Sequence, residues 1–200
     1  MKLDIAATLL FDANQIEPGL FLSVFQQGFI AQALVGVTIK ELLTEEFGLN
    51  QIYVEERIKT VFLDGKPVDD FNKTIVKNGS TLALSAAMPG LVGATFRKGG
   101  NLAVFRSTIT HNCVGSRAEK ETGYVKLKLF NLLVKELGIY FLKRGIFLDA
   151  KTANEALYHR TEHFWKSCKK ARIENLKLTS EKLIDVNWSE LAGLVYIRFE

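Results

Sequence analysis

The sequence predicts an α+β fold in which short strands, joined by tight turns, pack against amphipathic helices. The first observation is the stretch Thr60–Pro89, which holds two short apolar runs, Val61–Leu63 and Thr81–Ala87. Between them lie dipeptides such as Asn78-Gly79, which mark turns because Asn and Gly tolerate positive φ. The second observation is Thr38–Phe47, where apolar residues recur at helical spacing. A compact piece of sheet beside a helix follows from the two together.

The amino end allows two interpretations. Leu3–Phe11 is an apolar run that predicts a strand. Phe21–Phe25 and Phe29–Val35 could form a β-hairpin that turns at Gln26–Gly28. The same segment could instead be a helix that starts at Glu17-Pro18, because proline is favoured in the first turn of a helix. Short apolar runs do not distinguish the two. We favour the hairpin.

The helix predicted over Thr38–Phe47 has a defined start and end. Thr38 can cap it, and Glu41, three residues later, completes a capping box. Gly48 follows as a stop signal. The apolar residues that share one face of this helix are Ile39, Leu42, Leu43 and Phe47.

The carboxyl part of the chain predicts alternating strands and helices. Tyr124–Phe130 alternates apolar and polar residues, which predicts a half-buried strand. Leu132–Lys143 has helical spacing, although Gly138 should weaken or break that helix. Thr152–Lys170 is the strongest predicted helix, with Thr152 and Glu155 as its capping box. The remaining expected elements are a strand at Ile173–Leu178, a short helical turn at Trp188–Leu191 capped by Asn187, and a closing strand at Leu194–Phe199.

Two segments carry a resemblance to a known family. Phe62–Val68 reads FLDGKPV, and Lys77–Leu84 reads KNGSTLAL. This combination resembles the second half of a ubiquitin-like β-grasp domain and is most similar to the sulfur carriers of thiamine and molybdopterin synthesis. The resemblance covers about residues 20–90. It implies a ubiquitin-like β-grasp followed by a smaller, basic α/β region.

The chemistry of the sulfur carriers would apply to this chain only under one condition. Those proteins act through a free C-terminal Gly-Gly, whose carboxylate is adenylated and then thiocarboxylated. Here Gly99-Gly100 is internal, so carrier chemistry would need cleavage after Gly100. A glycine pair between apolar runs is also a hairpin signal. We therefore favour a hairpin turn between Ala94–Arg97 and Leu102–Ser107 over a processing site.

Composition and charge indicate a globular chain with two parts. Hydrophobic residues make up 48% and charged residues 24% of the chain, which excludes a disordered protein. No apolar run reaches the ~18–20 residues that a membrane span needs, and two cysteines favour a reducing cytoplasm. Residues 1–114 carry ten basic and eleven acidic side chains, against sixteen and eleven in residues 115–200. With a glycine-flanked polar stretch at Gly115–Gly123, this predicts domains at 1–114 and 115–200.

Two groups of residues have the composition of metal sites. His159–His163 matches the H-x-x-E-H pattern of inverted zinc peptidases, in which two histidines one helical turn apart share a metal. That chemistry needs a third ligand downstream, and the basic tail offers no convincing one, so we expect no metal at His159 and His163. His111 and Cys113 could join a metal or redox site, but a buried cysteine is more often inert packing.

A basic cluster beside two aromatic residues is the one signal for nucleic acid. Its members are Lys166, Lys169, Lys170 and Arg172, next to Phe164 and Trp165. Such a cluster can hold phosphates and stack bases. A run of charge at a helix end is more often solvated, so we expect binding that is at most weak and non-specific. The glycines of Pro89–Asn101 match no nucleotide-binding motif, and no cofactor is expected.

These observations favour a non-catalytic function. We expect a cytoplasmic binding or adaptor protein, related to the sulfur-carrier-like modules of prokaryotic cofactor metabolism, with a protein partner at an exposed sheet face. The alternative is a sulfur-carrier precursor processed at Gly100, and the third reading is a weak RNA-binding protein. An enzyme is less expected because no catalytic arrangement is legible among three histidines.

Overall fold

The computed structural model describes residues 3–106, 109–111, 119–174 and 176–200. The chain forms two compact units. The terminal unit combines Met1–Ile30 with Lys135–Glu200, and the central unit comprises Ala31–Val134. Part of the domain boundary expected at Gly115–Gly123, residues 115–118, lies outside the described residues.

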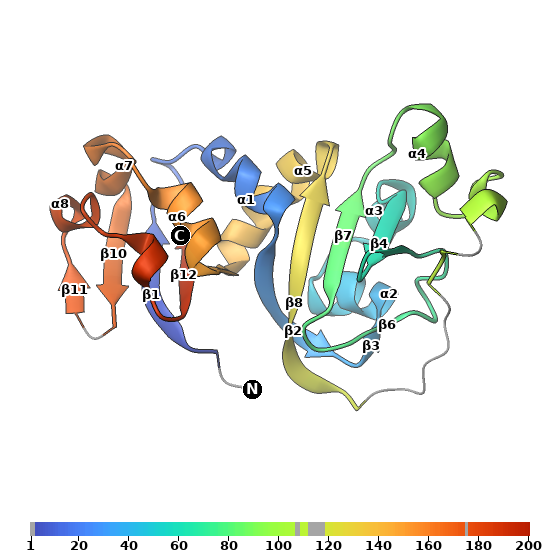
Figure 1. The fold of residues 1–200 in the computed structure, drawn as a ribbon, viewed down its shortest axis with the longest axis horizontal. Helices are drawn as coiled ribbons and strands as arrows, with labels where there is room; N and C mark the ends of the chain where they lie inside the picture. Colours follow the sequence, from blue (N-terminus) through green and yellow to red (C-terminus); the bar gives the residue numbers. More distant parts are fainter. Residues whose placement is uncertain (1–2, 107–108, 112–118, 175) are drawn as a thin grey trace. The chain divides into compact units, whose positions relative to one another are not determined.

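The terminal unit is built on strands from both ends of the chain (Figure 1). Strand β1 (Ile5–Phe11) pairs in parallel with β12 (Leu194–Phe199) and antiparallel with β10 (Cys168–Ile173). Strand β11 (Leu176–Leu178) extends this sheet beyond β10, and β9 (Ile146–Leu148) extends it beyond β12. The strand predictions at 3–11 and 194–199 are therefore confirmed.

The helical elements of this unit are mostly short. They are η1 (Pro18–Phe21), α1 (Leu22–Gln27), most of α5 (Leu132–Arg144), α6 (Ala150–Leu157), α7 (Glu162–Lys166), α8 (Ser180–Leu183) and η4 (Trp188–Glu190). Asn187 caps η4, as predicted, by accepting a hydrogen bond from the Ser189 N–H. Aromatic rings fill much of the core around the buried Phe11.

The central unit contains the turn-rich stretch that the sequence singled out. Its main strands are hydrogen-bonded in the order β2 (Phe29–Val35), β8 (Glu121–Phe130), β7 (Thr81–Ser85), β4 (Thr60–Leu63) and β5 (Lys66–Pro67). A separate two-stranded sheet pairs β3 (Val37–Thr38) with β6 (Ile75–Val76). The helical elements are α2 (Ile39–Glu41), η2 (Leu42–Glu46), α3 (Gln51–Glu56), α4 (Gly90–Phe96) and η3 (Ala103–Arg106). The strands expected in the apolar runs Val61–Leu63 and Thr81–Ala87 are present as β4 and β7, and β7 ends at Ser85.

The predicted helix at Thr38–Phe47 is present, with a widened second half. The Glu41 N–H donates to Thr38 Oγ1 at 3.1 Å, and the Thr38 N–H donates to Glu41 Oε2 at 2.7 Å, so the capping box is complete. The pKa of the Glu41 carboxyl is lowered, and the hydrogen bond that it accepts from the Thr38 N–H is the largest cause. From Leu42 the backbone follows a π-helix, and the Phe47 N–H donates to the Leu42 carbonyl.

The expected fold class is wrong. In place of a ubiquitin-like β-grasp followed by a small α/β region, the terminal unit holds mixed strands in the order β11-β10-β1-β12-β9, and the central unit holds mixed strands in the order β2-β8-β7-β4-β5. The opening hairpin of the β-grasp is absent, because residues 22–27 form helix α1 and leave β2 without a hairpin partner there. The parallel neighbour of β7 is β8, which follows it in the chain. The alternative of a helix after Glu17-Pro18 was the correct one for this segment.

Three further element predictions are corrected. The helix expected over Thr152–Lys170 ends at Leu157, resumes at Glu162 and gives way to β10 at Cys168. Asp149, and not a Thr152–Glu155 box, caps its first part by accepting from the Thr152 N–H. The strand expected at Ile173–Leu178 is two strands, with the end of β10 and all of β11 in a hairpin.

Leu42→Ala should lower the free energy of unfolding by about 2–5 kcal/mol, because it removes a fully buried side chain and leaves a cavity. Urea denaturation followed by circular dichroism measures this. The control is Ile52→Ala on the neighbouring helix α3, whose exposed side chain should change stability by about 0.5 kcal/mol or less. Equal losses in the two variants would contradict the burial of the 38–47 helix.

Gly138 does not break α5, which is continuous from Leu132 to Arg144. A Cβ at Gly138 would lie 2.5–2.9 Å from the ring of the buried Phe25. Gly138→Ala should therefore destabilise the protein by about 1–3 kcal/mol, despite the higher helix propensity of alanine. Gly19→Ala is the matched control, because its Cβ would meet no atom within 4 Å. A Gly138→Ala protein with a raised melting temperature would contradict this packing.

Candidate functional site

An ion pair inside the central unit ties together segments that are far apart in the sequence. The Arg106 guanidinium, with a side chain 1% exposed, donates to both carboxylate oxygens of Asp69, at 2.6 and 2.9 Å. Its Nε also donates to the Thr95 carbonyl at 2.7 Å, and Nη1 donates to Thr110 Oγ1 at 2.9 Å. Bidentate pairing fixes the orientation of both groups. Arg106 therefore fastens η3 to the end of α4 and to the loop after β5.

The start of α4 is set by close backbone packing. Pro89 occupies the N-cap position with extended backbone angles. A Cβ at the buried Gly93 would overlap the carbonyl oxygen of Met88, so this approach requires glycine. The Lys98 N–H donates to the Lys59 carbonyl at 2.8 Å, which attaches the turn after α4 to the start of β4. The segment from Pro89 to Arg106 is thus held from several sides.

This anchored segment exposes large apolar side chains. On α4, Leu91 is 74% and Val92 66% exposed, and on η3, Val104 is 76% and Phe105 80% exposed. We call these four residues the α4–η3 surface. A scattered exposed leucine is ordinary, whereas several large apolar side chains on two joined helical turns mark an interaction site.

The side chains beside the α4–η3 surface are basic. Arg97 is exposed at the end of α4, and Lys98 places its ammonium 4.0 Å from the centre of the Phe71 ring. Burial lowers the pKa of Lys98, and the charge of Lys59 lowers it further. The carboxylate of Glu55 partly offsets these two effects by raising the pKa of Lys98.

Gly99-Gly100 does not turn a hairpin. The chain before it is helix α4 and the chain after it is the 3₁₀ helix η3, so the two expected strands are absent. Gly99 has a φ of +61° and its N–H donates weakly to Asp69 Oδ1 at 3.4 Å. The pair is therefore a turn joined to the Arg106–Asp69 cluster, and processing after Gly100 stays a prediction.

The two histidines of the H-x-x-E-H pattern do not share a helix. His159 lies in the turn after α6 with a φ of +56°, and His163 lies on α7. Among the described residues, no three His, Cys, Asp or Glu side chains are grouped closely enough to hold a metal ion.

We expect no zinc at His159 and His163. Elemental analysis after gentle purification is the measurement, since a structural or catalytic zinc site needs three or four protein ligands. About one equivalent of zinc that disappears in a His163→Ala variant would contradict this prediction.

The other candidate metal or redox pair is only partly described. The backbone N–H of His111 donates to the Pro67 carbonyl at 2.8 Å. The imidazole Nδ1 of His111 is buried without a hydrogen-bond partner. Cys113 lies outside the described residues. Burial raises the pKa of the other cysteine, Cys168, to about 11, so this thiol stays protonated at neutral pH and is a poor nucleophile.

The basic cluster lies on two elements and not at one helix end. Lys166 is on α7, whereas Lys169, Lys170 and Arg172 are on β10. Lys166 forms an ion pair with Glu162 at 2.8 Å, which raises the pKa of Lys166, and Lys169 pairs with Asp12 at 3.1 Å. Two of the four cations thus have acidic partners already, and weak nucleic-acid binding stays a prediction.

Sequence reasoning missed the residues that the structure makes most conspicuous. Val104 and Phe105 fall in the expected hairpin strand Leu102–Ser107, and Leu91 and Val92 were assigned to no element, so the exposure of these four side chains was not predicted. The usable signal was the composition of Gly90–Phe96, GLVGATF, in which Thr95 is the one polar side chain, because a short helix without a polar face leaves apolar side chains in solvent. The ion pair of Asp69 and Arg106 could not be predicted from the sequence pattern, because 37 positions separate the two residues.

Comparisons with known proteins found no matching family model, no matching curated protein and no matching solved structure. Within the part of the chain that the structure describes, no helix is long and apolar enough to cross a bilayer.

Proposed function

We propose that this is a non-catalytic binding protein of the cytoplasm, and that the α4–η3 surface docks a partner protein. The observation that carries the proposal is the exposure of Leu91, Val92, Val104 and Phe105 on a segment anchored by Arg106. An anchored apolar surface loses little conformational entropy on binding, which raises affinity for a given contact area. This surface, and not a sheet face, is therefore our proposal for the partner contact.

The charges around the surface define the chemistry of the partner. Arg97, exposed at the end of α4, is basic, so the partner should present an apolar groove with an acidic side chain at its rim. A membrane suits the surface less well. Helices that lie in a membrane interface expose a long apolar face opposite a strongly charged one, whereas α4 has only seven residues.

A site-specific crosslinking experiment tests this proposal. A photoreactive amino acid at position 105, in the full chain expressed in its native cells, should crosslink one defined protein. The purified partner should then bind the wild-type protein at least about tenfold more tightly than the Phe105→Ser variant, because a large apolar contact is lost. Binding should weaken with salt and in Arg97→Glu. Leu176→Ser is the matched control, since this equally exposed apolar residue lies on β11 in the other unit.

Three outcomes would overturn the proposal. The first is an isolated partner that binds Phe105→Ser as well as wild type. The second is binding to phosphatidylglycerol vesicles that depends on Phe105, which would make the surface a membrane contact. The third is self-association that Phe105→Ser abolishes, which would make a second copy the occupant.

The intact mass of the protein from native cells separates this proposal from the sulfur-carrier precursor. A full-length mass of 22.4 kDa supports the binding protein. A fragment that ends at Gly100 would support the carrier, whose chemistry needs that free carboxylate.

A further inference from the structure

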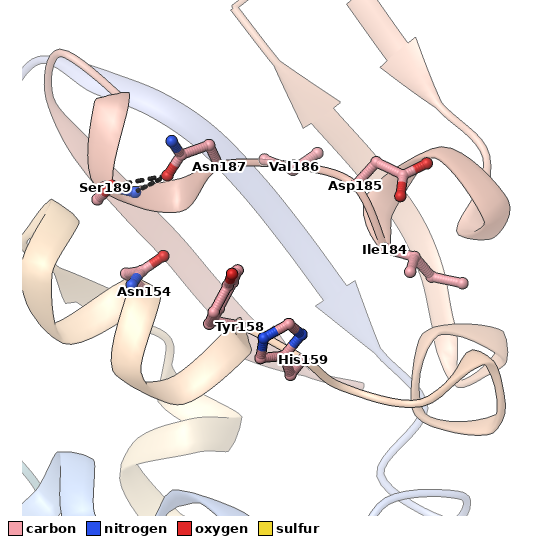
Figure 2. Close-up of a pocket in the computed structure, with 8 residues that line it drawn as sticks. All are labelled: Asn154, Tyr158, His159, Ile184, Asp185, Val186, Asn187 and Ser189. Carbon is pink, nitrogen blue, oxygen red and sulfur yellow. Dashed lines mark hydrogen bonds between the residues drawn. The ribbon is translucent and has the colours of Figure 1, made fainter.

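A pocket of about 660 Å³ lies within the terminal unit, whereas the α4–η3 surface belongs to the central unit. Figure 2 shows its two walls: the carboxyl end of α6 with the turn that follows it, and the segment from Ile184 to Ser189. A volume of this size is typical of small-molecule sites. The lining residues are Asn154, Tyr158, His159, Ile184, Asp185, Val186, Asn187 and Ser189.

The first wall offers an unused hydrogen-bond acceptor. The Oδ1 atom of Asn154 is buried and has no hydrogen-bond partner. In Figure 2 it points toward the segment that forms the opposite wall. A buried amide oxygen without a partner loses the free energy of a hydrogen bond, so a ligand hydroxyl or N–H that donates to it would recover that loss.

The same wall ends in a strained aromatic pair. His159 adopts a φ of +56°, a conformation that costs free energy for a residue with a Cβ. This backbone places its ring 3.8 Å, between centroids, from the ring of Tyr158. Both side chains are exposed and line the pocket. The two rings are tilted by 39° to each other, so what they offer a ligand ring is an outer ring face and not one flat surface.

The second wall is held in place by its own contacts. Asn187 Oδ1 accepts from Ser189 Oγ at 2.6 Å, and Asn187 Nδ2 donates to Glu190 Oε1 at 2.7 Å. Trp188, which lies between the lining residues Asn187 and Ser189, is buried and stacks on Trp165 with centroids 5.6 Å apart. The wall is therefore preorganised, which lowers the entropic cost of binding.

The charge of the lining selects among classes of ligand. None of its eight residues is Lys or Arg, and its one carboxylate is Asp185, which disfavours phosphates and carboxylates. Of the amide and hydroxyl groups in the lining, those that can both donate to and accept from a ligand are the Asn154 amide and the Tyr158 phenol, since the Asn187 amide and the Ser189 hydroxyl already bond to each other. Ammonium ligands need acceptors alone, whereas sugar hydroxyls need donors and acceptors together.

We propose that this pocket binds a neutral sugar. An outer ring face of the Tyr158–His159 pair would pack against the C–H face of the sugar. Asn154 and Asp185 would accept hydrogen bonds from its hydroxyls. The proposal is independent of the α4–η3 surface, because no residue of the pocket belongs to the central unit.

The test uses the full chain and a panel of D-glucose, D-galactose, D-mannose, D-ribose and sucrose. Saturation-transfer NMR should show binding of at least one of them with a Kd of about 1 mM or tighter. The same sugar should change the intrinsic fluorescence, because Trp188 lies between two lining residues of the second wall and Trp165 stacks on it.

Variants assign that binding to the pocket. Tyr158→Ala and Asp185→Ala replace exposed side chains and should each weaken it at least about tenfold. Glu155→Gln is the matched control, since this exposed residue of α6 does not line the pocket and its variant should bind like wild type.

The same assay contains the outcomes that would overturn the proposal. Choline or putrescine that binds while no sugar does would make the pocket an amine site around Asp185. Inorganic phosphate that binds while no sugar does would contradict the charge argument. Sugar binding that persists in Tyr158→Ala and Asp185→Ala, or no binding by any probe, would also refute it.

Discussion

Phe11→Ala should lower the free energy of unfolding by about 3–5 kcal/mol, which is a large share of the stability of a domain. The Phe11 side chain is fully buried on β1, between β10 and β12. Removal of its ring leaves a cavity among four other rings that rigid neighbouring strands cannot close. Those rings are Phe164 at 5.3 Å, Phe199 at 5.8 Å, Trp165 at 6.3 Å and Phe21 at 6.4 Å between centroids.

Urea denaturation followed by tryptophan fluorescence measures this loss, because Trp165 is one of the neighbours. The matched control is Ile5→Ala, which removes an exposed side chain from the other end of the same strand. That change should cost less than about 1 kcal/mol. A Phe11→Ala loss as small as the Ile5→Ala loss would show that the ring cluster is not the core of the terminal unit.

Asp69→Ala should cost about 3 kcal/mol, because it leaves the guanidinium of Arg106 buried and unpaired. This value is at the lower end of the cost that is usual for breaking a buried ion pair, since the Asp69 side chain is itself 37% exposed and water can reach it. The variant should be destabilised locally, around α4 and η3, as well as globally. Amide hydrogen exchange should show faster exchange over α4 and η3 than over β7.

A double-mutant cycle isolates the pair. Arg106→Ala in the Asp69→Ala background should cost much less than in wild type, because the interaction is already broken. The control is Lys73→Ala, which removes an exposed ion pair with Asp70 and should cost less than about 1 kcal/mol. Losses from Asp69→Ala and Arg106→Ala that simply add would contradict their coupling.

The sequence predicted structure best where the cause is local. The capping box of Thr38 and Glu41 and the cap at Asn187 each depend on residues within three positions, and both are present. The turn signals between Val61 and Thr81 likewise placed β4 and β7 correctly. Residues this close in the chain meet through backbone geometry alone, so their pattern is sufficient.

Pairing between distant segments was not predictable from these patterns. An alternating or apolar run shows that a strand exists but not which strand lies beside it, so the parallel pair of β7 with β8 was missed. The break of the 152–170 helix at Tyr158 and His159 was missed because His159 takes a left-handed conformation without a glycine or asparagine signal. The α4–η3 surface depends on a contact between distant segments, and the pocket depends on the break after α6. The sequence pattern therefore did not identify Arg106 or Asn154 as site residues.

The parallel pairing of β1 with β12 has a consequence for synthesis on the ribosome. The two strands are about 190 residues apart in the chain, so at roughly 5–20 residues per second β1 waits about 10–40 s for its neighbour. All of the central unit is synthesised during this interval. The apolar side chains of β1 would be exposed to nascent-chain chaperones throughout it. Nascent chains released before β12 should therefore bind such chaperones through the Ile5–Phe11 segment.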